Sequence, residues 1–401
     1  TRDKASESFH QVPSTRGGRR RRNMKLHFDV AVIGGGIVGL AHAWMAKRRG
    51  LRVVVLERSP AAEGASVRNF GMIWPIGQPA GQLYELALKS REFWLQLKTH
   101  GVLDVRTCGS IHLAHREDEL AVLQEFCNHR SHQTKMLSAE EVLQRTHLAN
   151  PDGLLGGMLS ITELRVDPRT ACQRLASWLQ SEEGVEFHYG AMVVAVDDKH
   201  VHAADQRVWT AERIIVCSGS DLKTLYPEIL QSSDLRLCKL QMLKSVAQPQ
   251  RDSNTPHIAS GLTLRHYPSF QKCPSHAGLR RRIAEETPEL DRYGIHVMAS
   301  QLSSGRVILG DSHEYDDQIT PFDNMEIDGL IVRELRKVIR LDDWRMAQRW
   351  HGVYAKHPRL PVLEVDAADR TTVFTGTGGA GMTLSFALAD RAWTRWTGEN
   401  A

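Results

Sequence analysis

Three closely spaced glycines and a later glutamate have the residue types and spacing best suited to chemistry. Gly34, Gly36 and Gly39 have the G-x-G-x-x-G spacing and follow the short apolar run 30–33. The first glycine permits a tight turn, the second lets a pyrophosphate approach the backbone, and the third lets a helix pack on a strand. Glu57 follows about 20 positions later, where an acidic side chain accepts hydrogen bonds from ribose hydroxyls. The pattern favours a dinucleotide-binding unit over a glycine turn in some other α/β unit.

A strand, a helix and a second strand must hold these residues in place. We expect the first strand at 30–33, where an apolar run is typical of a buried parallel strand. The helix is predicted for 37–49, and Gly50 is a suitable C′ residue for its end. The second strand is predicted for 52–56, which puts Glu57 at its carboxyl end.

Two further segments are suited to lie along a bound dinucleotide. Residues 58–75 begin with small residues and continue into large apolar residues at 70 and 72–74. An ordinary surface loop is the alternative, but it would expose those apolar side chains together. Residues 371–383 read as a strand, a glycine cluster and the start of a helix that reaches about 395. A helix start next to glycines is a second site for an anion or dipole.

Charge and composition argue against several classes of protein. The 401 residues suffice for two or three domains, and 24% charged with 41% hydrophobic residues is ordinary for a globular chain. Residues 1–23 hold seven Lys/Arg and two Asp/Glu, whereas the remainder holds 44 and 45. We expect 1–23 to be a disordered basic tail and not a signal peptide, and we expect no nucleic-acid partner. The chain contains no run of about 18 apolar residues, so we expect no membrane span.

The cysteines and histidines are not spaced as metal ligands. The six cysteines, at 108, 127, 172, 217, 238 and 273, form no C-x-x-C pair, and the 19 histidines are scattered along the chain. We therefore expect reduced thiols in a cytoplasmic protein and no metal site.

The remaining pattern predicts an α/β fold whose second domain is α+β. A Rossmann-like domain is expected from 24–110, 151–222 and 345–401, interleaved with an antiparallel-sheet domain from 111–150 and 223–344. Helices are expected at 82–100, 118–127, 169–180, 278–290 and 327–339, with a short one opening at Ser138 in a capping box. Strands are expected at 110–114, 185–189, 213–219, 238–246, 257–267, 294–300 and 306–310, with a hairpin over 192–196 and 208–209.

Taken together, the glycine motif, Glu57 and the segments 65–72, 185–196, 214–219 and 376–383 resemble the D-amino-acid oxidase and glycine/sarcosine oxidase superfamily. The resemblance implies an FAD-binding domain, a substrate-binding sheet domain and FAD in an extended pose. It also implies non-covalent FAD, because no Cys follows Cys273 and no His lies between Glu57 and Pro75, where covalent members carry their link. The residues that it places at FAD are Gly34, Gly36, Ile37, Val38, Gly39, Glu57, Arg58, Ser66, Arg68, Asn69, Phe70, Gly71, Met72, Val193, Ser218, Gly219, Gly378, Gly379, Gly381, Met382 and Thr383.

The chain departs from the pattern of α-amino-acid oxidases at one position. Those relatives commonly carry Gly-Leu-Arg-Pro before the last strand, and Tyr354 stands where the arginine would be. The segments 68–79, 240–244, 266–270, 293–296 and 310–315 look like a subgroup of FAD-dependent oxidoreductases linked to phosphonate breakdown. The similarity suggests a substrate with an amine at one end and a phosphonate at the other. Candidate substrate-binding residues are Tyr267, Arg265, Lys356 and Met242, and candidate catalytic residues are His351, Tyr354 and His313.

The resemblance implies oxidation of an aminophosphonate such as 2-aminoethylphosphonate or its N-methyl or hydroxy form, by hydride transfer to flavin N5. The resulting imine would hydrolyse to an aldehyde, and electrons would pass to oxygen or another acceptor. His351 or His313 would accept the ammonium proton. The nearest alternative is an oxidase of a secondary or small amino acid (sarcosine, glycine or proline-like) whose carboxylate binds Lys356 or Arg265. Two further alternatives are a flavoprotein subunit of an electron-transfer complex and RNA binding through 19–22.

Overall fold

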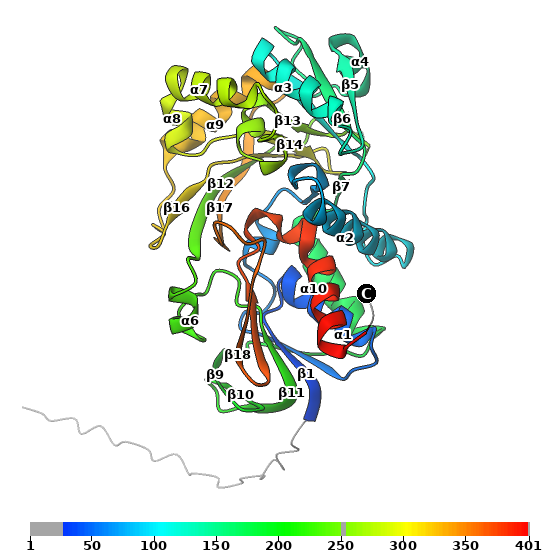
Figure 1. Cartoon of the computed structure of the whole chain (residues 1–401), viewed down its shortest axis with the longest axis vertical. Coiled ribbons are helices and arrows are strands. Elements are labelled where there is room, and N and C mark those ends of the chain that lie inside the picture. The colour runs from blue at the N-terminus through cyan, green and yellow to red at the C-terminus, as the bar shows by residue number, and fades with distance from the viewer. Residues whose placement is uncertain (1–26, 250–253, 400–401) are drawn as a thin grey trace, which may run out of the picture.

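The computed structural model describes residues 27–249 and 254–399, so the predicted disordered tail over 1–23 lies outside the described residues. Two lobes are visible in Figure 1, and each is built on one large β-sheet. The lobe with β1 and α10 contains the beginning and the end of the described chain, and the other lobe contains mostly its middle. This arrangement confirms the predicted α/β class with interleaved sheets.

The first sheet has a parallel centre and contains eight strands within the described residues. β1 (His27–Ile33) pairs in parallel with β2 (Val53–Glu57) on one side and with β11 (Val208–Val216) on the other. Most side chains of β1 and β2 are buried, because their valines, isoleucine and leucine suit a strand covered on both faces. The other strands are β8 (Glu186–Tyr189), β9 (Val193–Asp197), β10 (His200–Ala203), β18 (Leu363–Ala368) and β19 (Thr371–Thr375).

Four helices share one apolar core with the strands of this sheet, and α1 packs directly on its parallel centre. They are α1 (Ile37–Lys47), α2 (Gln82–Thr99), α5 (Pro168–Ser181) and α10 (Gly381–Thr397). Trp44 of α1 lies edge-on to Phe386 of α10, with the ring centroids 5.4 Å apart. Trp94 of α2 also contacts Phe386 and donates from Nε1 to the Met382 carbonyl at 2.9 Å. These contacts fix α1, α2 and α10 relative to one another.

The second sheet is largely antiparallel and contains nine strands within the described residues. Its long strand β12 (Arg236–Ser245) pairs antiparallel with β15 (Val307–Gly310), β16 (Glu314–Asp316) and β17 (Met346–Lys356). The other strands are β4 (Ser110–Ala114), β5 (Thr134–Ser138), β6 (Gly156–Ser160), β13 (His257–Ala259) and β14 (Met298–Gln301), of which β4 and β13 pair in parallel. β3 (Met72–Ile73) and β7 (Leu164–Arg165) form a separate two-stranded ribbon.

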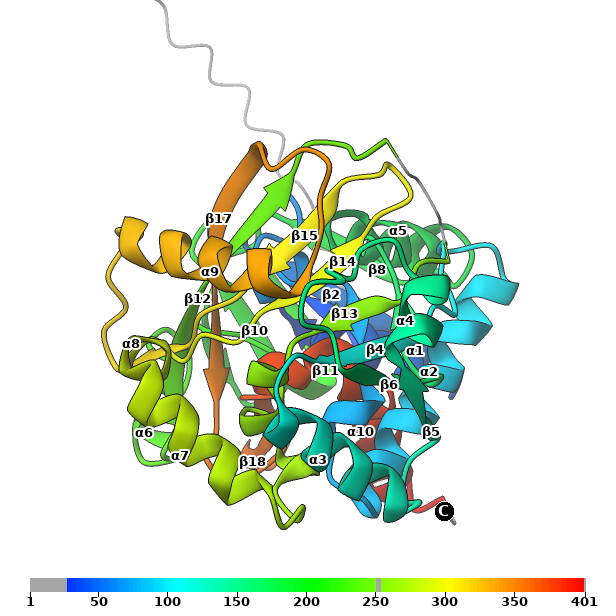
Figure 2. The same cartoon turned by 90° about the horizontal axis from the view of Figure 1, so that it is seen from above.

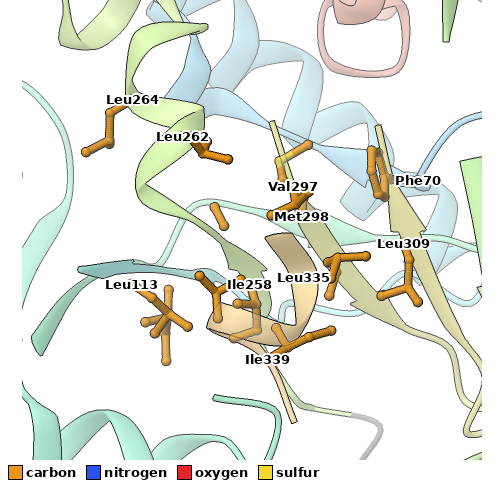
Figure 3. Close-up of a cluster of buried hydrophobic side chains, with 14 of the residues drawn as sticks. Phe70, Leu113, Ile258, Leu262, Leu264, Val297, Met298, Leu309, Leu335 and Ile339 are labelled. Carbon is orange, nitrogen blue, oxygen red and sulfur yellow. The ribbon is translucent and has the colours of Figure 1, made fainter. Parts of the chain in front are cut away.

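Helices cover the second sheet on its outer side (Figure 2). They are α3 (Glu117–Asn128), α4 (Ala139–Arg145), α7 (His276–Glu286), α8 (Pro288–Arg292) and α9 (Met325–Val338), while the short α6 (Pro227–Gln231) precedes β12. Figure 3 shows Leu335 of α9 packed toward Leu309 and Ile258 of the strands. Each of these side chains is at most 1% exposed, and burying one contributes roughly 1.5–3 kcal/mol. Phe70, which comes from the lobe of the first sheet, reaches the edge of the same cluster.

Two predicted β-segments are wrong in detail. The strand expected at 257–267 ends at Ala259, and two short 3-10 helices follow, η3 (Gly261–Arg265) and η4 (Pro268–Phe270). The hydroxyl of Thr263 donates to the Ser260 carbonyl at 2.6 Å, a local bond that competes with strand pairing. The expected hairpin at 192–209 is a three-stranded meander of β9, β10 and β11, and β11 continues into the parallel centre.

Sheet membership also differs from the predicted segments in two places. β6 and β17 lie in the segments 151–222 and 345–401, which were assigned to the dinucleotide-binding domain, yet both belong to the second sheet. Pairing partners distant in sequence cause this, because β17 pairs with β12 along almost its whole length.

Over 27–249 and 254–399, no helix combines the length and apolar character needed to cross a membrane. All six cysteines are free.

Candidate active site

A cavity of about 850 Å³ lies between the lobes, at the carboxyl ends of the parallel strands. Ligands of open α/β sheets bind at this edge. The strand ends of β1, β2, β11 and β19 all contribute to its wall, and β12, β14 and β17 of the second sheet close the other side. The predicted residues that line it are Gly34, Gly36, Ile37, Val38, Gly39, Glu57, Arg58, Ser66, Arg68, Asn69, Phe70, Val193, Ser218, Gly219, Met242, Tyr267, His313, Tyr354, Lys356, Gly378, Gly379, Gly381 and Met382.

The first glycine motif leaves no room for side chains. A Cβ added to Gly34, whose φ is +112°, would lie 2.2 Å from the Cys217 carbonyl oxygen. A Cβ added to Gly39 would lie 1.9 Å from the Gly34 carbonyl oxygen. The Glu57 carboxylate accepts from the backbone N–H of Gly35 at 2.7 Å and of Ser59 at 2.9 Å, so it is fixed at the end of β2. A bare backbone turn beside an oriented carboxylate suits the pyrophosphate and ribose of a dinucleotide.

The loop after β2 docks on the start of α1 and then on β17. Ser66 Oγ accepts from the N–H of Ile37 at 3.0 Å. The Asn69 side chain braces the loop, because its Nδ2 donates to the Ser66 carbonyl at 2.9 Å and its Oδ1 accepts from the Gly71 N–H at 2.7 Å. Trp350 of β17 donates from Nε1 to the Arg68 carbonyl at 3.2 Å. This loop therefore joins both lobes along one wall of the cavity.

Three residues that were predicted to contact the cofactor support the wall without lining it. A Cβ on Gly71 would meet the Val166 carbonyl oxygen at 2.0 Å, and Met72 pairs with Arg165 in the β3–β7 ribbon. The Thr383 hydroxyl accepts from the Trp74 N–H at 2.9 Å. Gly71, Met72 and Thr383 thus contact other protein atoms and support the wall from behind.

The second glycine cluster faces the end of β17. A Cβ on Gly378, whose φ is +57°, would lie 3.1 Å from Lys356 Cγ, and one on Gly379 would lie 3.7 Å from the Tyr354 hydroxyl. Lys356 Nζ donates to the Tyr315 hydroxyl at 3.3 Å. Burial lowers the pKa of Lys356 and raises that of Tyr354 well above its ordinary value. Lys356 and the Tyr354 hydroxyl thus stand beside the glycines that precede α10, and the Tyr315 hydroxyl accepts from Lys356.

Two predicted residues do not line the cavity, which corrects their assignment to the substrate. The Arg265 guanidinium forms an ion pair with Asp291 and donates to the Leu290 and Ile295 carbonyls. His351 is not among the residues that line the cavity, and its Nδ1 lies 2.8 Å from the Asp323 carboxylate. Both side chains bind acidic partners between 25 and 30 positions away along the chain, as ordinary structural ion pairs do.

Sequence reasoning missed a group of polar residues in the same cavity. His266, His296 and Asp311 line it together with the predicted His313. The ring centroids of His266 and His296 are 4.0 Å apart, and those of His296 and His313 are 4.8 Å apart. Burial raises the pKa of Asp311 well above its ordinary value and lowers the pKa of each histidine. Their motifs at 266–270, 293–296 and 310–315 were the available signal, but spacing along the chain does not show that these loops converge.

The cavity fits FAD on the geometry of its walls. Both glycine segments present bare backbone, and Glu57 is oriented for a ribose. Among the described residues, the buried Ser218 Oγ at the end of β11 has no hydrogen-bond partner, so a bound polar group can satisfy it. Val193, close to the Glu57 end of β2, and Phe70, which packs in the core of the second sheet, also line the cavity, so it is long enough for an extended cofactor.

Comparison with known proteins agrees with this geometry. Residues 29–392 match the DAO family, described as FAD dependent oxidoreductase. D-amino acid dehydrogenase of Helicobacter pylori is 27% identical over 250 residues, which cover 48% of this chain and 60% of that protein. Glycine oxidase of Geobacillus kaustophilus is 25% identical over 210 residues, which cover 49% of this chain and 56% of that protein. The match thus spans about 60% of the length of these curated relatives.

Solved structures resemble the whole fold. The crystal structure of glycine oxidase from Geobacillus kaustophilus has a TM-score of 0.74 at 17% identity, over 94% of this chain and 96% of that one. Iminodiacetate oxidase from Chelativorans has a TM-score of 0.66 at 19% identity, over 93% of this chain and 96% of that one. These likenesses establish the fold, and the family match covers nearly all of the described residues. The chain belongs to the DAO family of FAD-dependent oxidoreductases.

Proposed function

We propose that this oxidoreductase acts on a small amine that carries an anionic group, first of all a glycine- or sarcosine-like amino acid. The observation that carries the proposal is the place of Lys356. Lys356 lines the cavity at the end of β17, and its stem runs along Gly378 next to the first turn of α10. A partly buried cation in a cavity binds an anion through charge-assisted hydrogen bonds. The Tyr315 and Tyr354 hydroxyls supply further polar contacts beside it.

The same lysine favours the reactive form of the substrate. An amine gives up a hydride from its neighbouring carbon only when its nitrogen is uncharged. A fixed positive charge and burial both disfavour a second ammonium, so Lys356 and the buried walls formed by Met242 and Met298 favour the neutral amine. Bound FAD supplies the hydride acceptor. The substrate loses a hydride and the nitrogen's proton to become an imine, which water converts to a carbonyl compound and a free amine.

The comparisons support the class of substrate. The printed names of the similar proteins include a glycine oxidase, a D-amino acid dehydrogenase and an iminodiacetate oxidase. Each of these compounds carries an amine nitrogen and at least one carboxylate. The chain carries Tyr354 instead of an arginine fork, so we propose that Lys356 holds the anion in its place. We further propose that FAD is held without a covalent bond and is released when the protein is precipitated with acid.

A second candidate substrate is an aminophosphonate, and one observation favours it. The donors beside Gly378 are an ammonium and separate hydroxyls rather than a planar guanidinium. A planar fork matches a carboxylate in two parallel bonds, whereas a tetrahedral phosphonate suits several separate donors. Lys356 and Tyr354, which both line the cavity, would then contact two of its oxygens.

Anaerobic bleaching of the flavin absorbance with matched substrate pairs tests the function and separates the two candidates. Glycine is compared with aminomethylphosphonate, β-alanine with 2-aminoethylphosphonate, and sarcosine with its N-methyl phosphonate counterpart. Faster bleaching by the carboxylates confirms the amino-acid class, and faster bleaching by the phosphonates favours the second candidate. No bleaching by either series, with dithionite still reducing the flavin, would overturn the proposal of an amine substrate. Readmitting air then shows whether oxygen is the acceptor.

A further inference from the structure

Three histidines from separate segments meet in one wall of the cavity. His266 follows η3, His296 precedes β14, and His313 lies between β15 and β16. Each imidazole offers one nitrogen, and these three nitrogens lie within 4.8 Å of one another. The ring centroids of His266 and His313 are 4.4 Å apart. We refer to His266, His296 and His313 as the histidine cluster.

The backbone holds the histidine cluster in place. The N–H of His296 donates to the Asp311 carbonyl at 3.2 Å, and the N–H of Asp311 donates to the His296 carbonyl at 2.9 Å. The N–H of His313 donates to the Tyr293 carbonyl at 2.9 Å. His266 is held by its own turn, because its N–H donates to the Thr263 carbonyl at 3.0 Å. The rings are thus brought together by main-chain bonds that need no ligand.

The polar atoms of this wall are poorly satisfied by the protein itself. Within the described ranges, both ring nitrogens of His296 and the Oδ1 atom of Asp311 are buried without a hydrogen-bond partner. The Asp311 carboxylate lies 3.6 Å from His296 Nε2 and 3.9 Å from His313 Nε2, which is beyond hydrogen-bond length. Unpaired buried groups of this kind are unfavourable, and native proteins keep few of them without a ligand or ion.

We propose that the histidine cluster binds one divalent transition-metal ion, with Zn²⁺ the preferred ion, and that Asp311 supports the site as the carboxylate beside the rings. Imidazole is a suitable ligand for zinc, and sites with three protein ligands keep an open position. Since Zn–N bonds are about 2.0–2.1 Å, nitrogens on one tetrahedral ion lie about 3.3 Å apart. The rings therefore need to approach by about 1.5 Å at most from their present limit of 4.8 Å. A carboxylate beside the ligating rings is a common way to orient them.

The open position faces the cavity, because all three histidines and Asp311 line it. It can take a water or an oxygen of a bound anion, and the ion's positive charge would be balanced in part by Asp311. Lys356 is the neighbouring cation whose charge opposes the ion, so occupancy will be highest when an anion also enters the cavity. The metal site does not depend on the proposed amine substrate, since its ligands and Lys356 are different residues.

Metal titration of the untagged holoprotein tests the proposal. The protein is first dialysed against a chelator, then titrated with Zn²⁺ and, separately, with Co²⁺, and the bound metal is counted after desalting. We expect one equivalent of each metal to bind. Bound Co²⁺ should also give visible absorption bands, typical of a low-symmetry site, at longer wavelengths than the flavin bands. Binding of less than one equivalent, or binding that only reflects loose surface histidines, would overturn the site.

Variants assign the bound metal to the cluster. His296→Ala and His313→Ala are expected to weaken Zn²⁺ binding at least about 10-fold. His200→Ala, in β10 of the other sheet, is the matched control and should bind as the wild type does. Because removal of a buried ring can unfold the chain, His296→Gln and the FAD content of every variant are measured alongside. Unchanged affinity in folded His296→Gln and His313→Ala would show that the metal binds elsewhere. Flavin bleaching by amines is measured on separate samples. A negative metal-binding result therefore does not change the conclusion about the amine substrate.

Discussion

The hydroxyl of Ser66 accepts a 3.0 Å hydrogen bond from the backbone N–H of Ile37, the first residue of α1. The bond joins the glycine motif to the loop that continues along the cavity toward β17. Ser66 also stands 3.0 Å from where a Cβ of Gly36 would be, so the loop and the turn are in close contact. Two segments that are predicted separately from the sequence are one structural unit.

Ser66→Ala removes this bond and is expected to weaken FAD binding. A typical hydrogen bond contributes about 1 kcal/mol net, so the dissociation constant of FAD should rise about 5-fold. Fluorescence quenching of FAD added to apoprotein measures the change. Ser177→Ala on the exposed face of α5 removes a similar hydroxyl bond far from the cavity and should leave FAD affinity unaltered. Equal affinities of the two variants would contradict the role of Ser66.

Gly39→Ala tests the close packing of α1 on β1. The added methyl would lie 1.9 Å from the Gly34 carbonyl oxygen, which cannot move without disturbing the turn. We expect loss of FAD and a fall in stability of several kcal/mol, as overpacking of backbone produces. Gly278→Ala in α7 has no atom within 4 Å of the new methyl and should keep FAD and stability, with a gain of up to about 1 kcal/mol. Absorbance of purified protein at flavin wavelengths and a thermal melt give both results. A yellow, stable Gly39→Ala protein would refute the packing argument.

Local patterns explain why the dinucleotide-binding unit was predictable. The observed β1, α1 and β2 lie within about three residues of the predicted bounds, and the capping box of α4 is present at Ser138. An apolar strand, a glycine turn and a helix that ends near a glycine each depend on neighbours along the chain. The predicted helices at 82–100 and 327–339 were confirmed as α2 and α9 for the same reason.

Contacts distant in sequence explain what was missed. Arg265 and His351 were suitable ligands by residue type, but Asp291 and Asp323 bind them across the fold. The histidine cluster depends on the pairing of β13, β14 and β15, which brings positions 266, 296 and 313 together. The spacing of residues along the chain predicts neither kind of contact, so both are seen only in the folded structure.

His42 predicts how stability depends on pH. Its ring is fully buried in α1 against Phe374, with centroids 4.3 Å apart, and burial lowers its pKa from 6.5 to about 3. The folded state therefore stays unprotonated between pH 6.5 and about 3, while the unfolded state gains a proton there. The contribution of the neutral, buried ring to the free energy of unfolding is complete above pH 6.5. It is lost as the pH falls, by about 2 kcal/mol between pH 7 and 5.

His42→Leu removes this dependence while keeping an apolar side chain at the site. The free energy of unfolding is measured with urea at pH 7 and at pH 5, with saturating FAD. Its decrease between the two pH values is expected to be about 2 kcal/mol smaller for the variant than for the wild type. His100→Leu, exposed at the end of α2, is the control and should lose stability like the wild type. If His42→Leu and the wild type lose equal stability between the two pH values, the buried ring is not the group that titrates. Only the difference between pH values is compared, so the packing change at neutral pH does not enter.

Lys356 gives the sharpest test of how the cavity recognises its substrate. Lys356→Met keeps the length of the stem along Gly378 but removes the charge beside Tyr315. A charge-assisted hydrogen bond contributes about 1.5–3 kcal/mol, so half-saturation of bleaching by an anionic amine should rise about 10- to 100-fold. Lys199→Met, in the exposed turn between β9 and β10, is the matched control. An uncharged amine of the same size should lose little affinity in Lys356→Met.

The pH profile of the same variant separates a charge effect from a steric one. Burial lowers the pKa of Lys356 from its ordinary value of 10.5, so its ammonium is lost at a lower pH than that of an exposed lysine. Wild-type affinity for the anionic amine should therefore fall as the pH rises toward this lowered pKa. Lys356→Met lacks the group and should show no such fall. Identical alkaline profiles for wild type and Lys356→Met would mean that another group holds the anion.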